Sequence, residues 1–368
     1  MSKNKEDKFL NITGLMSGTS LDGIDISLIK TNGQDYTSLN KNFFYEYNSK
    51  TRKIFTECLE NSELILKKKT LMSRLNKFVT KLHLKALNNS GFLKNTDVIG
   101  FHGQTIFHNA KNNQSIQLGN PKILAETTRK KVIFNFRQND IKNNGQGAPL
   151  APIFHKAIIE KYKFNLPCCF LNIGGISNIT YWDGNQLIGF DTGPGNALLD
   201  KYVQKYLKKN FDYNGDLASK GAIDFNLVNS FLANPYFGES FPKSLDKLHF
   251  NNEFMQLEIK KLSTTDSLAT LVNFTVRSIR NSLNFLPQVP KNILVTGGGA
   301  KNQYLIKELK KILNINFIEI SDYDINSDFI ESELIAYLAA RCVYNLPITY
   351  PSTTGSKKPL KGGEIYDL

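Results

Sequence analysis

The chain has 368 residues, of which 41% are hydrophobic and 21% charged, and its formal net charge is +13. This composition is typical of a soluble globular protein of two domains, and neither a bilayer-spanning run nor a signal peptide appears, so we expect a cytoplasmic protein that binds no membrane. The basic residues are scattered and form no nucleic-acid signature, which favours a small anionic substrate over nucleic acid. The four cysteines lack the spacing of metal ligands.

The first motif is the sequence GLMSGTSLDGID at residues 14–25, which lies between the apolar runs 9–12 and 24–29. We expect two strands joined by a turn in which Gly14, Gly18 and Gly23 let the backbone approach an anion. Asp22 and Asp25 can orient a reacting hydroxyl or a hydrated metal. An ordinary hairpin turn is the alternative. The expected hydroxyl donors are Ser17, Thr19 and Ser20.

The rest of the first half places polar residues at the ends of predicted strands. Residues 51–89 have the spacing of two helices, residues 98–101 form a strand that ends in His-Gly-Gln-Thr, and residues 132–136 form a strand that ends in Arg137. Arg137 is equally consistent with an ion pair at a domain boundary and with bidentate recognition of a carboxylate or phosphate. His102 and His108 have no third ligand nearby, which favours hydrogen-bonding roles over metal binding.

The second half repeats the pattern of the opening. A strand at residues 169–173, a Gly-Gly-Ile-Ser-Asn turn at 174–178 and a strand at 179–182 indicate a duplicated unit with a second anion cradle. A strand at 187–190 then delivers Asp191 into a glycine-rich loop before a predicted helix at 197–207. Asp191 is therefore either a general base or the cap of that helix.

The last elements are a strand at 293–296, a triple glycine at 297–299 and a helix at 302–313. Ligand atoms can lie against the backbone there, although a tight turn without a ligand is common and the spacing of a P-loop or dinucleotide fold is absent. A helix at 330–344 carries Glu331, which is either a site residue or a solvent-facing acid of the first turn.

Seven ordered motifs together resemble the anhydro-N-acetylmuramic acid kinases, which belong to the sugar kinase, actin and heat-shock chaperone superfamily. They are GLMSGTSLDGID, FHGQTIFH, QLGNP, NGQGAPLAPIFH, LNIGGISNIT, FDTGPGNALLD and VTGGGAKN. The resemblance implies an α/β fold with two ribonuclease H-like domains that flank a deep nucleotide and sugar cleft. We expect the first domain at residues 1–139 with the tail 346–368, and the second at residues 140–345.

The resemblance also implies an ATP-dependent kinase that hydrolytically opens 1,6-anhydro-N-acetylmuramic acid and phosphorylates O6 during peptidoglycan recycling. ATP, Mg²⁺ and the sugar are the expected partners, and a homodimer is a further possibility. The alternatives are a plain sugar kinase, an ATP-dependent clamp like the chaperones, and a polyphosphate or nucleotide phosphatase.

Residue by residue, the resemblance implies that Asp191 is the base. The implied ATP contacts are Gly18, Thr19, Ser20, Leu21, Asp22, Gly23, Ile24, Asp25, Gly174, Gly175, Gly297, Gly298 and Gly299. The implied sugar contacts are Asp22, Gln104, Arg137, Asp191 and Glu331. Asn135, Asn144, Tyr202 and Tyr337 depart from the family pattern, and the segment after Pro242 lacks its Thr-Gly-Arg-Glu, so a role borrowed for Lys247 is in doubt.

Overall fold

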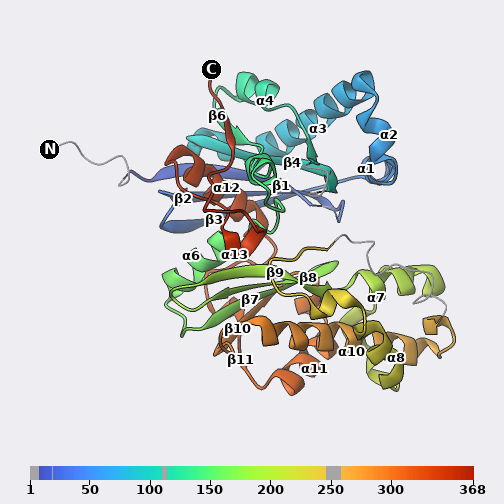
Figure 1. Cartoon of the computed structure of the whole chain (residues 1–368). Helices are drawn as coiled ribbons and strands as arrows, with labels where there is room; N and C mark the ends of the chain where they lie inside the picture. Colours follow the sequence, from blue (N-terminus) through green and yellow to red (C-terminus); the bar gives the residue numbers. More distant parts are fainter. Residues whose placement is uncertain (1–7, 19, 110–113, 246–257) are drawn as a thin grey trace. The chain divides into compact units, whose positions relative to one another are not determined.

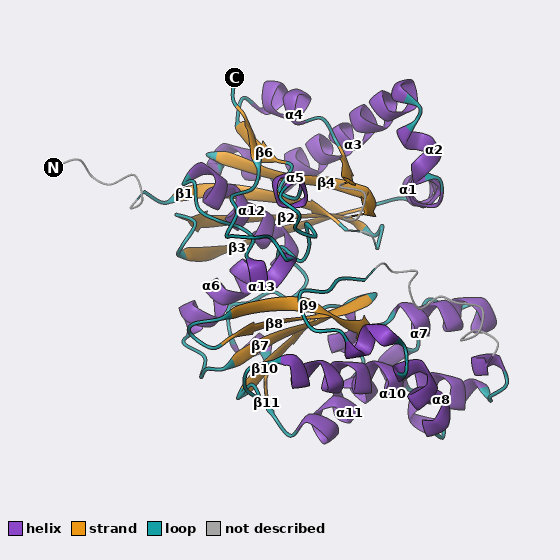
Figure 2. Ribbon diagram, in the orientation of Figure 1, coloured by secondary structure: helices purple, strands orange, loops and turns teal. Residues whose placement is uncertain are grey.

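The computed structural model describes residues 8–18, 20–109, 114–245 and 258–368, and it divides into two compact units (Figure 1). Unit 1 comprises Met1–Lys161 and Asp324–Leu368, and unit 2 comprises Tyr162–Tyr323. Both units combine a sheet with helices (Figure 2), so the chain has the expected α/β architecture. None of the described helices combines the length and apolarity needed to cross a membrane.

Unit 1 is built on a sheet with the strand order β12-β6-β4-β1-β2-β3, in which β5 also pairs with β4. β1, β2 and β3 are antiparallel neighbours, whereas β1, β4 and β6 run parallel. The strands are β1 Leu10–Ser17, β2 Gly23–Thr31, β3 Tyr36–Glu46, β4 Val98–Asn109, β5 Gln114–Leu118, β6 Lys131–Phe134 and β12 Glu364–Tyr366. The helices are α1 Ser49–Glu60, α2 Ser62–Leu66, α3 Lys69–Ser90, α4 Pro121–Thr128, α5 Gln138–Lys142, α6 Pro152–Tyr162, α12 Ile330–Val343 and α13 Pro351–Thr354.

Glycines in the central strands let α12 approach one face of this sheet very closely. A Cβ added at Gly14 of β1 would overlap the backbone oxygen of Ser332, and one at Gly100 of β4 would lie 2.6 Å from the backbone oxygen of Ile335. Side chains alternate along a strand, so Leu15 faces the other side of the sheet, where it joins a core with Phe55 of α1 and Val79 of α3. Gly14 therefore serves helix packing and does not belong to the turn.

This close approach predicts that Gly14→Ala lowers the free energy of unfolding by about 2–3 kcal/mol, because neither the strand nor the helix backbone can move away without repacking. Gly238→Ala is the matched control, since no atom of the described residues lies within 4 Å of the position of its Cβ. Urea unfolding of both variants checks the prediction. Equal midpoints for Gly14→Ala and the unmodified chain would contradict it.

Unit 2 contains a sheet with the strand order β11-β10-β7-β8-β9. Its strands are β7 Cys168–Ile173, β8 Ile176–Trp182, β9 Leu187–Pro194, β10 Asn292–Thr296 and β11 Asn316–Ile318. Its α-helices are α7 Ala197–Tyr202, α8 Phe225–Leu232, α10 Thr264–Ser282 and α11 Gln303–Leu313, and a π-helical turn follows α7 at Val203–Leu207. Leu171, Phe190, Phe274 and Leu305 are fully buried members of its core.

The two sheets share one plan, which confirms the duplicated pattern of strands. In each unit three consecutive strands form an antiparallel meander, and the first of them is followed across the sheet by two parallel strands. The tail also returns to the first sheet, because β12 pairs with β6.

The expected domain boundaries at residues 139/140 and 345/346 differ from the division at 161/162 and 323/324. The physical reason is packing. α12 covers the first sheet at Gly14 and Gly100, and Phe154 of α6 lies 5.0 Å from Tyr36 between ring centroids, so both helices belong to unit 1. We also expected two helices at residues 51–89, but the structure has three there, because α1 ends at Glu60 and α2 begins directly after the cap residue Asn61.

Candidate active site

Each unit carries one group of the predicted site residues. In unit 1 the turn that joins β1 to β2 spans only residues 18–22, because β1 continues to Ser17 and β2 begins at Gly23. Gly18 is partly exposed and Ser20 exposed, and the nearest described atom to a Cβ added at Gly18, Ser20 Oγ, is 3.6 Å away. The turn is therefore accessible to a ligand. Thr19 lies outside the described residues, as does Lys247 in unit 2.

Ser17 supports the turn from the protein interior. We expected its hydroxyl to donate to a ligand, but the structure turns it toward buried partners instead. It is fully buried, and its Oγ lies 2.5 Å from Gln104 Oε1 and 2.7 Å from the hydroxyl of Tyr47. Gln104 Nε2 donates to the carbonyl of Gly18 at 3.1 Å, and the Tyr47 amide donates to the carbonyl of Asp22 at 2.9 Å. Both ends of the turn are thus tied to one buried network. Gln104 stays a predicted sugar contact, but its amide supports the turn.

Carboxylates surround this turn. The pKa of Asp25 is raised to about 7, chiefly by burial and then by the negative charges of Glu331, Asp328 and Asp22. Asp22 and Glu331 are exposed, and a Glu331 oxygen lies 4.0 Å from the Cβ position of Gly18. Glu331 of α12 thus lies beside a turn more than 300 residues earlier in the chain. Gly23 and Ile24 lie within β2, and the Ile24 side chain is fully buried in the core.

Arg137 follows β6 and is partly buried. Its Nη1 donates to the carbonyl of Gly147 at 2.8 Å, and its Nε and Nη2 lie 3.3 and 3.2 Å from His102 Nε2. Neither partner is anionic, so these contacts are hydrogen bonds and do not form an ion pair. Burial lowers the pKa of Arg137 to about 10, while the charges of Glu331 and Asp140 raise it, so the guanidinium stays charged at neutral pH. His102 fulfils the predicted hydrogen-bonding role.

In unit 2 three glycine-containing segments converge. A Cβ at Gly195 would overlap the carbonyl of Gly174, and one at Gly297 would overlap Asn172 Oδ1 and lie 2.8 Å from the carbonyl of Ile173. Gly297 also has a φ of +79°, which a residue with a side chain rarely adopts. These contacts bring the turn after β7, the end of β9 and the turn after β10 together. Gly175 accepts from the Gly195 amide, and Gly298 and Gly299 open a short 3₁₀ turn before α11.

Asp191 lies within β9 and does not end a strand at residue 190, because the ladder with β8 continues past it. The register shifts directly after Asp191, and such irregularities redirect neighbouring side chains. Its Oδ2 accepts from the Leu245 amide at 2.7 Å. The helix-cap interpretation is therefore wrong, and Asn196 occupies the N-cap of α7.

Burial raises the pKa of Asp191 to about 7, although the Leu245 amide and the charge of Lys243 lower it. A partly buried carboxylate with such a pKa suits a general base at neutral pH. The backbone around it is also fixed, since the Tyr236 hydroxyl donates to the Asp191 carbonyl at 2.5 Å and the Asp191 amide donates to the Lys243 carbonyl at 3.1 Å.

Lys243 is a residue that sequence reasoning missed. It is 4% exposed, its Nζ donates to the Tyr236 carbonyl at 3.0 Å, and it lies 4.5 and 4.7 Å from the ring centroids of Tyr236 and Phe285. Burial lowers its pKa to about 8, opposed by the charges of Glu239 and Asp191. In the sequence, the signal for a buried lysine was its position between Phe241 and Leu245. Its proximity to Asp191 had no such signal, because only the fold brings the two residues together.

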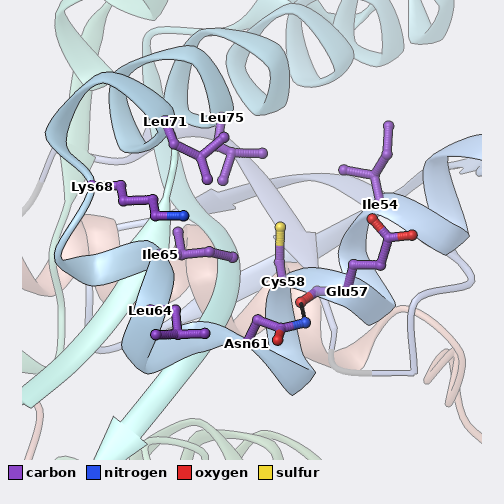
Figure 3. Close-up of a pocket in the computed structure, with 9 residues that line it drawn as sticks. All are labelled: Ile54, Glu57, Cys58, Asn61, Leu64, Ile65, Lys68, Leu71 and Leu75. Carbon is purple, nitrogen blue, oxygen red and sulfur yellow. Dashed lines mark hydrogen bonds between the residues drawn. The ribbon is translucent and has the colours of Figure 1, made fainter.

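A separate pocket of about 330 Å³ lies among α1, α2 and α3, and none of the predicted site residues lines it (Figure 3). Its walls are mostly Leu and Ile, and Cys58 is its buried polar group. Burial raises the pKa of the Cys58 thiol, so this cysteine is a poor nucleophile at neutral pH.

Comparison with known proteins identifies the family of the chain. The family model described as anhydro-N-acetylmuramic acid kinase matches residues 10–368. The anhydro-N-acetylmuramic acid kinase of Rhodopseudomonas palustris strain BisB18 is 38% identical over 362 residues, which cover 96% of this chain and 98% of that protein. The corresponding protein of Pelagibacter ubique strain HTCC1062 is 38% identical over 379 residues, with coverages of 98% and 99%. Component A of the (R)-2-hydroxyglutaryl-CoA dehydratase of Acidaminococcus fermentans, a solved structure, aligns with 11% identity and a TM-score of 0.45 over 90% of this chain and 99% of that chain. The match along the whole length shows that the chain belongs to the anhydro-N-acetylmuramic acid kinase family.

Proposed function

We propose that the chain is a cytoplasmic ATP-dependent kinase that opens the anhydro bridge of 1,6-anhydro-N-acetylmuramic acid with water and phosphorylates O6. The product is N-acetylmuramic acid 6-phosphate, an intermediate of peptidoglycan recycling. The observation that carries the proposal is the presence, in a chain that the family model matches over residues 10–368, of a partly buried Asp191 whose pKa lies near 7.

Asp191 accepts the proton of the water that attacks the anomeric carbon. The new bond joins C1 to the water oxygen, and the C1–O6 bond breaks. O6 bonds to the γ-phosphorus of ATP as the bond from that phosphorus to the leaving ADP oxygen breaks. Glycoside opening ordinarily needs an acid as well as a base, and phosphoryl transfer to O6 takes the place of the acid here.

The phosphates of ATP bind at the turn that joins β1 to β2, where the space beside Gly18 lets an anion approach the backbone. The nucleoside lies against the glycines of unit 2, where Gly298 is exposed and the nearest described atom to an added Cβ, Asn196 Nδ2, is 3.6 Å away. A ligand can therefore reach the backbone there. Phosphoryl transfer depends mainly on positioning and charge stabilisation, which such fixed backbone supplies.

Mg²⁺ prefers oxygen ligands and is commonly held by one or two carboxylates together with substrate phosphates. Asp22 and Asp25 suit this role because Asp22 lies in the turn and Asp25 lies in β2 close to it. The negative charges of Asp22 and Glu331 both act on Asp25, which places several carboxylates near one another. Among the residues that the structure describes, no three His, Cys, Asp or Glu side chains converge to hold a metal by themselves. We therefore assign the remaining ligands to the phosphates of ATP. When bound, the ion neutralises charge during phosphoryl transfer.

The sugar contacts Asp22, Arg137 and Glu331. Electrostatic coupling of Glu331 to both Arg137 and Asp25 supports a common location for these groups in unit 1. Arg137 binds the lactyl carboxylate or a neighbouring polar group, because its rigid fork of donors matches a planar anion.

The pH dependence follows from the pKa of Asp191. A general base acts only when it is deprotonated, so kcat/KM should fall about tenfold per pH unit below about 7. Lys243→Met removes the positive charge that lowers this pKa, and should move the acidic limb of the profile to higher pH. Lys260→Met changes an exposed lysine of the same unit and is the control. An acidic limb at the same pH in Lys243→Met would contradict the electrostatic role of Lys243.

The proposed function is tested by following ADP formation with 1,6-anhydro-N-acetylmuramic acid, reducing N-acetylmuramic acid, N-acetylglucosamine and no sugar. We expect turnover with the anhydro sugar and a product heavier by one phosphoryl group (HPO₃) and one water. A plain sugar kinase would favour the reducing sugar, a chaperone-like clamp would hydrolyse ATP at a rate independent of sugar, and a phosphatase would release inorganic phosphate.

A further inference from the structure

The side chain of Arg137 is held at two points before any ligand binds. One is the carbonyl of Gly147, which accepts from Nη1 at 2.8 Å. The Gly147 amide in turn donates to Asp140 Oδ2 at 2.7 Å, and Asp140 is 1% exposed and also accepts from Thr349 and Thr354. The second point is His102, whose Nε2 lies within 3.3 Å of both Nε and Nη2.

The contacts of His102 determine its protonation. Its Nδ1 lies 3.1 Å from the carbonyl of Gly103, and because a carbonyl only accepts, Nδ1 carries the proton. Arg137 only donates, so Nε2 must be the unprotonated acceptor. Burial and the positive charge of Arg137 lower the pKa of His102 to about 3, which agrees with a neutral ring.

The backbone of β4 places the ring for this contact. Leu15 of β1 pairs with Phe101, but Met16 pairs with Gly103, so His102 is the extra residue of a bulge. Gly103 follows with a φ of +73°, and a Cβ there would overlap the carbonyl of Leu118. A bulge redirects a side chain from the regular alternation, and this one directs His102 to Arg137.

A guanidinium has five N–H groups. The contacts with His102 and Gly147 use three of them, which leaves one on Nη1 and one on Nη2. We infer that His102 is a positioning residue that fixes the Arg137 fork so that these two donors face an anionic group of the sugar. The inference rests on the proposed function for the identity of that group, but the restraint of Arg137 does not.

Two polar substitutions separate the roles of the two ring nitrogens. His102→Asn keeps a donor at the position of Nδ1 for Gly103 but cannot reach Arg137, whereas His102→Gln places a carbonyl oxygen near the position of Nε2. His83→Asn is the matched control, because His83 is also fully buried in unit 1 and its Nδ1 also contacts a backbone carbonyl, that of Val79, at 2.9 Å.

The first measurement is the Nε–H signal of Arg137 in ¹⁵N-labelled enzyme, assigned with Arg137→Lys. We expect a resolved, slowly exchanging signal in the unmodified chain, His102→Gln and His83→Asn, and its loss by exchange in His102→Asn. The second is kcat/KM for 1,6-anhydro-N-acetylmuramic acid relative to 1,6-anhydro-N-acetylglucosamine, which lacks the lactyl carboxylate. We expect His102→Asn to reduce this ratio about tenfold through the KM of the first sugar, by analogy with the loss of a residue that hydrogen-bonds a metal ligand, with the KM of ATP unchanged.

A persistent Arg137 signal in His102→Asn, or an unchanged sugar ratio with the signal lost, would overturn the inference. A similar reduction of the ratio in His83→Asn would also overturn it, because the effect would then follow from general destabilisation. If the unmodified chain phosphorylates neither sugar, the proposed function fails, and the Arg137 signals alone still decide whether His102 restrains the guanidinium.

Discussion

Replacing Asp191 with Asn should lower kcat by ~10²–10⁴-fold while ATP still binds, because Asn keeps the shape of the side chain but accepts no proton. The Asn carbonyl oxygen can still accept from the Leu245 amide, which now bonds Oδ2 at 2.7 Å, so the local backbone should persist. Initial rates of ADP formation with the anhydro sugar, together with nucleotide titration, check both parts.

Asp200→Asn is the matched control for this variant. Asp200 of α7 is also a partly buried carboxylate of unit 2, and burial raises its pKa to about 6. Because Asp200 lies in α7 and not in the strand that carries Asp191, its substitution should leave kcat near that of the unmodified chain. An active Asp191→Asn enzyme would remove the assignment of the base.

Thermal stability gives a second readout for Asp191→Asn. The pKa of Asp191 in the folded chain, about 7, is above the ordinary value of 3.8, so the folded state binds this proton more tightly than the unfolded state. The unmodified chain therefore loses stability from this group as the pH rises from about 4 to about 7, and Asn does not. The difference in Tm between Asp191→Asn and the unmodified chain should therefore shift in favour of Asp191→Asn as the pH rises across this window.

Replacing Arg137 with Lys should raise the KM of the sugar about 30- to 100-fold, because an ammonium cannot contact Gly147 and His102 and also present two coplanar donors to a carboxylate. The KM of ATP should change much less. Arg52→Lys is the control, since Arg52 forms an exposed ion pair with Glu46 at 2.8 Å in the same unit. Unaltered sugar KM and kcat in Arg137→Lys would leave this residue a structural role only.

The duplicated meander could be predicted from the sequence because it rests on local signals. Apolar runs such as residues 169–173 and 187–190 are bounded by glycine-rich turns, and each became part of a strand. The unit that α12 joins could not be predicted in this way. Its position depends on the contact of Gly14 with Ser332, and nothing local to either segment indicates that partner.

The candidate site shows the same division. Apolar runs followed by polar residues, together with glycines, pointed to Asp191, Arg137 and the turn of residues 18–22 from local pattern alone, although Asp191 lies within β9 and not at its end. The supporting groups did not stand out, because Ser17, Gln104 and Tyr47 come from three different strands or loops and meet only in the folded sheet. Lys243 was missed for a related reason. Its side chain is only 4% exposed in the structure, but its local sequence does not distinguish it from a surface lysine.

The central claim is that water attacks the anomeric carbon and phosphorus receives O6, with Asp191 as the base. The most direct test is a single turnover of the unmodified enzyme with ATP and 1,6-anhydro-N-acetylmuramic acid in ¹⁸O-labelled water, with the product analysed before the anomeric oxygen exchanges. The account predicts label at the anomeric oxygen of N-acetylmuramic acid 6-phosphate and none in the phosphate. Label in the phosphate would mean that water attacks phosphorus, and it would contradict the coupled opening of the ring.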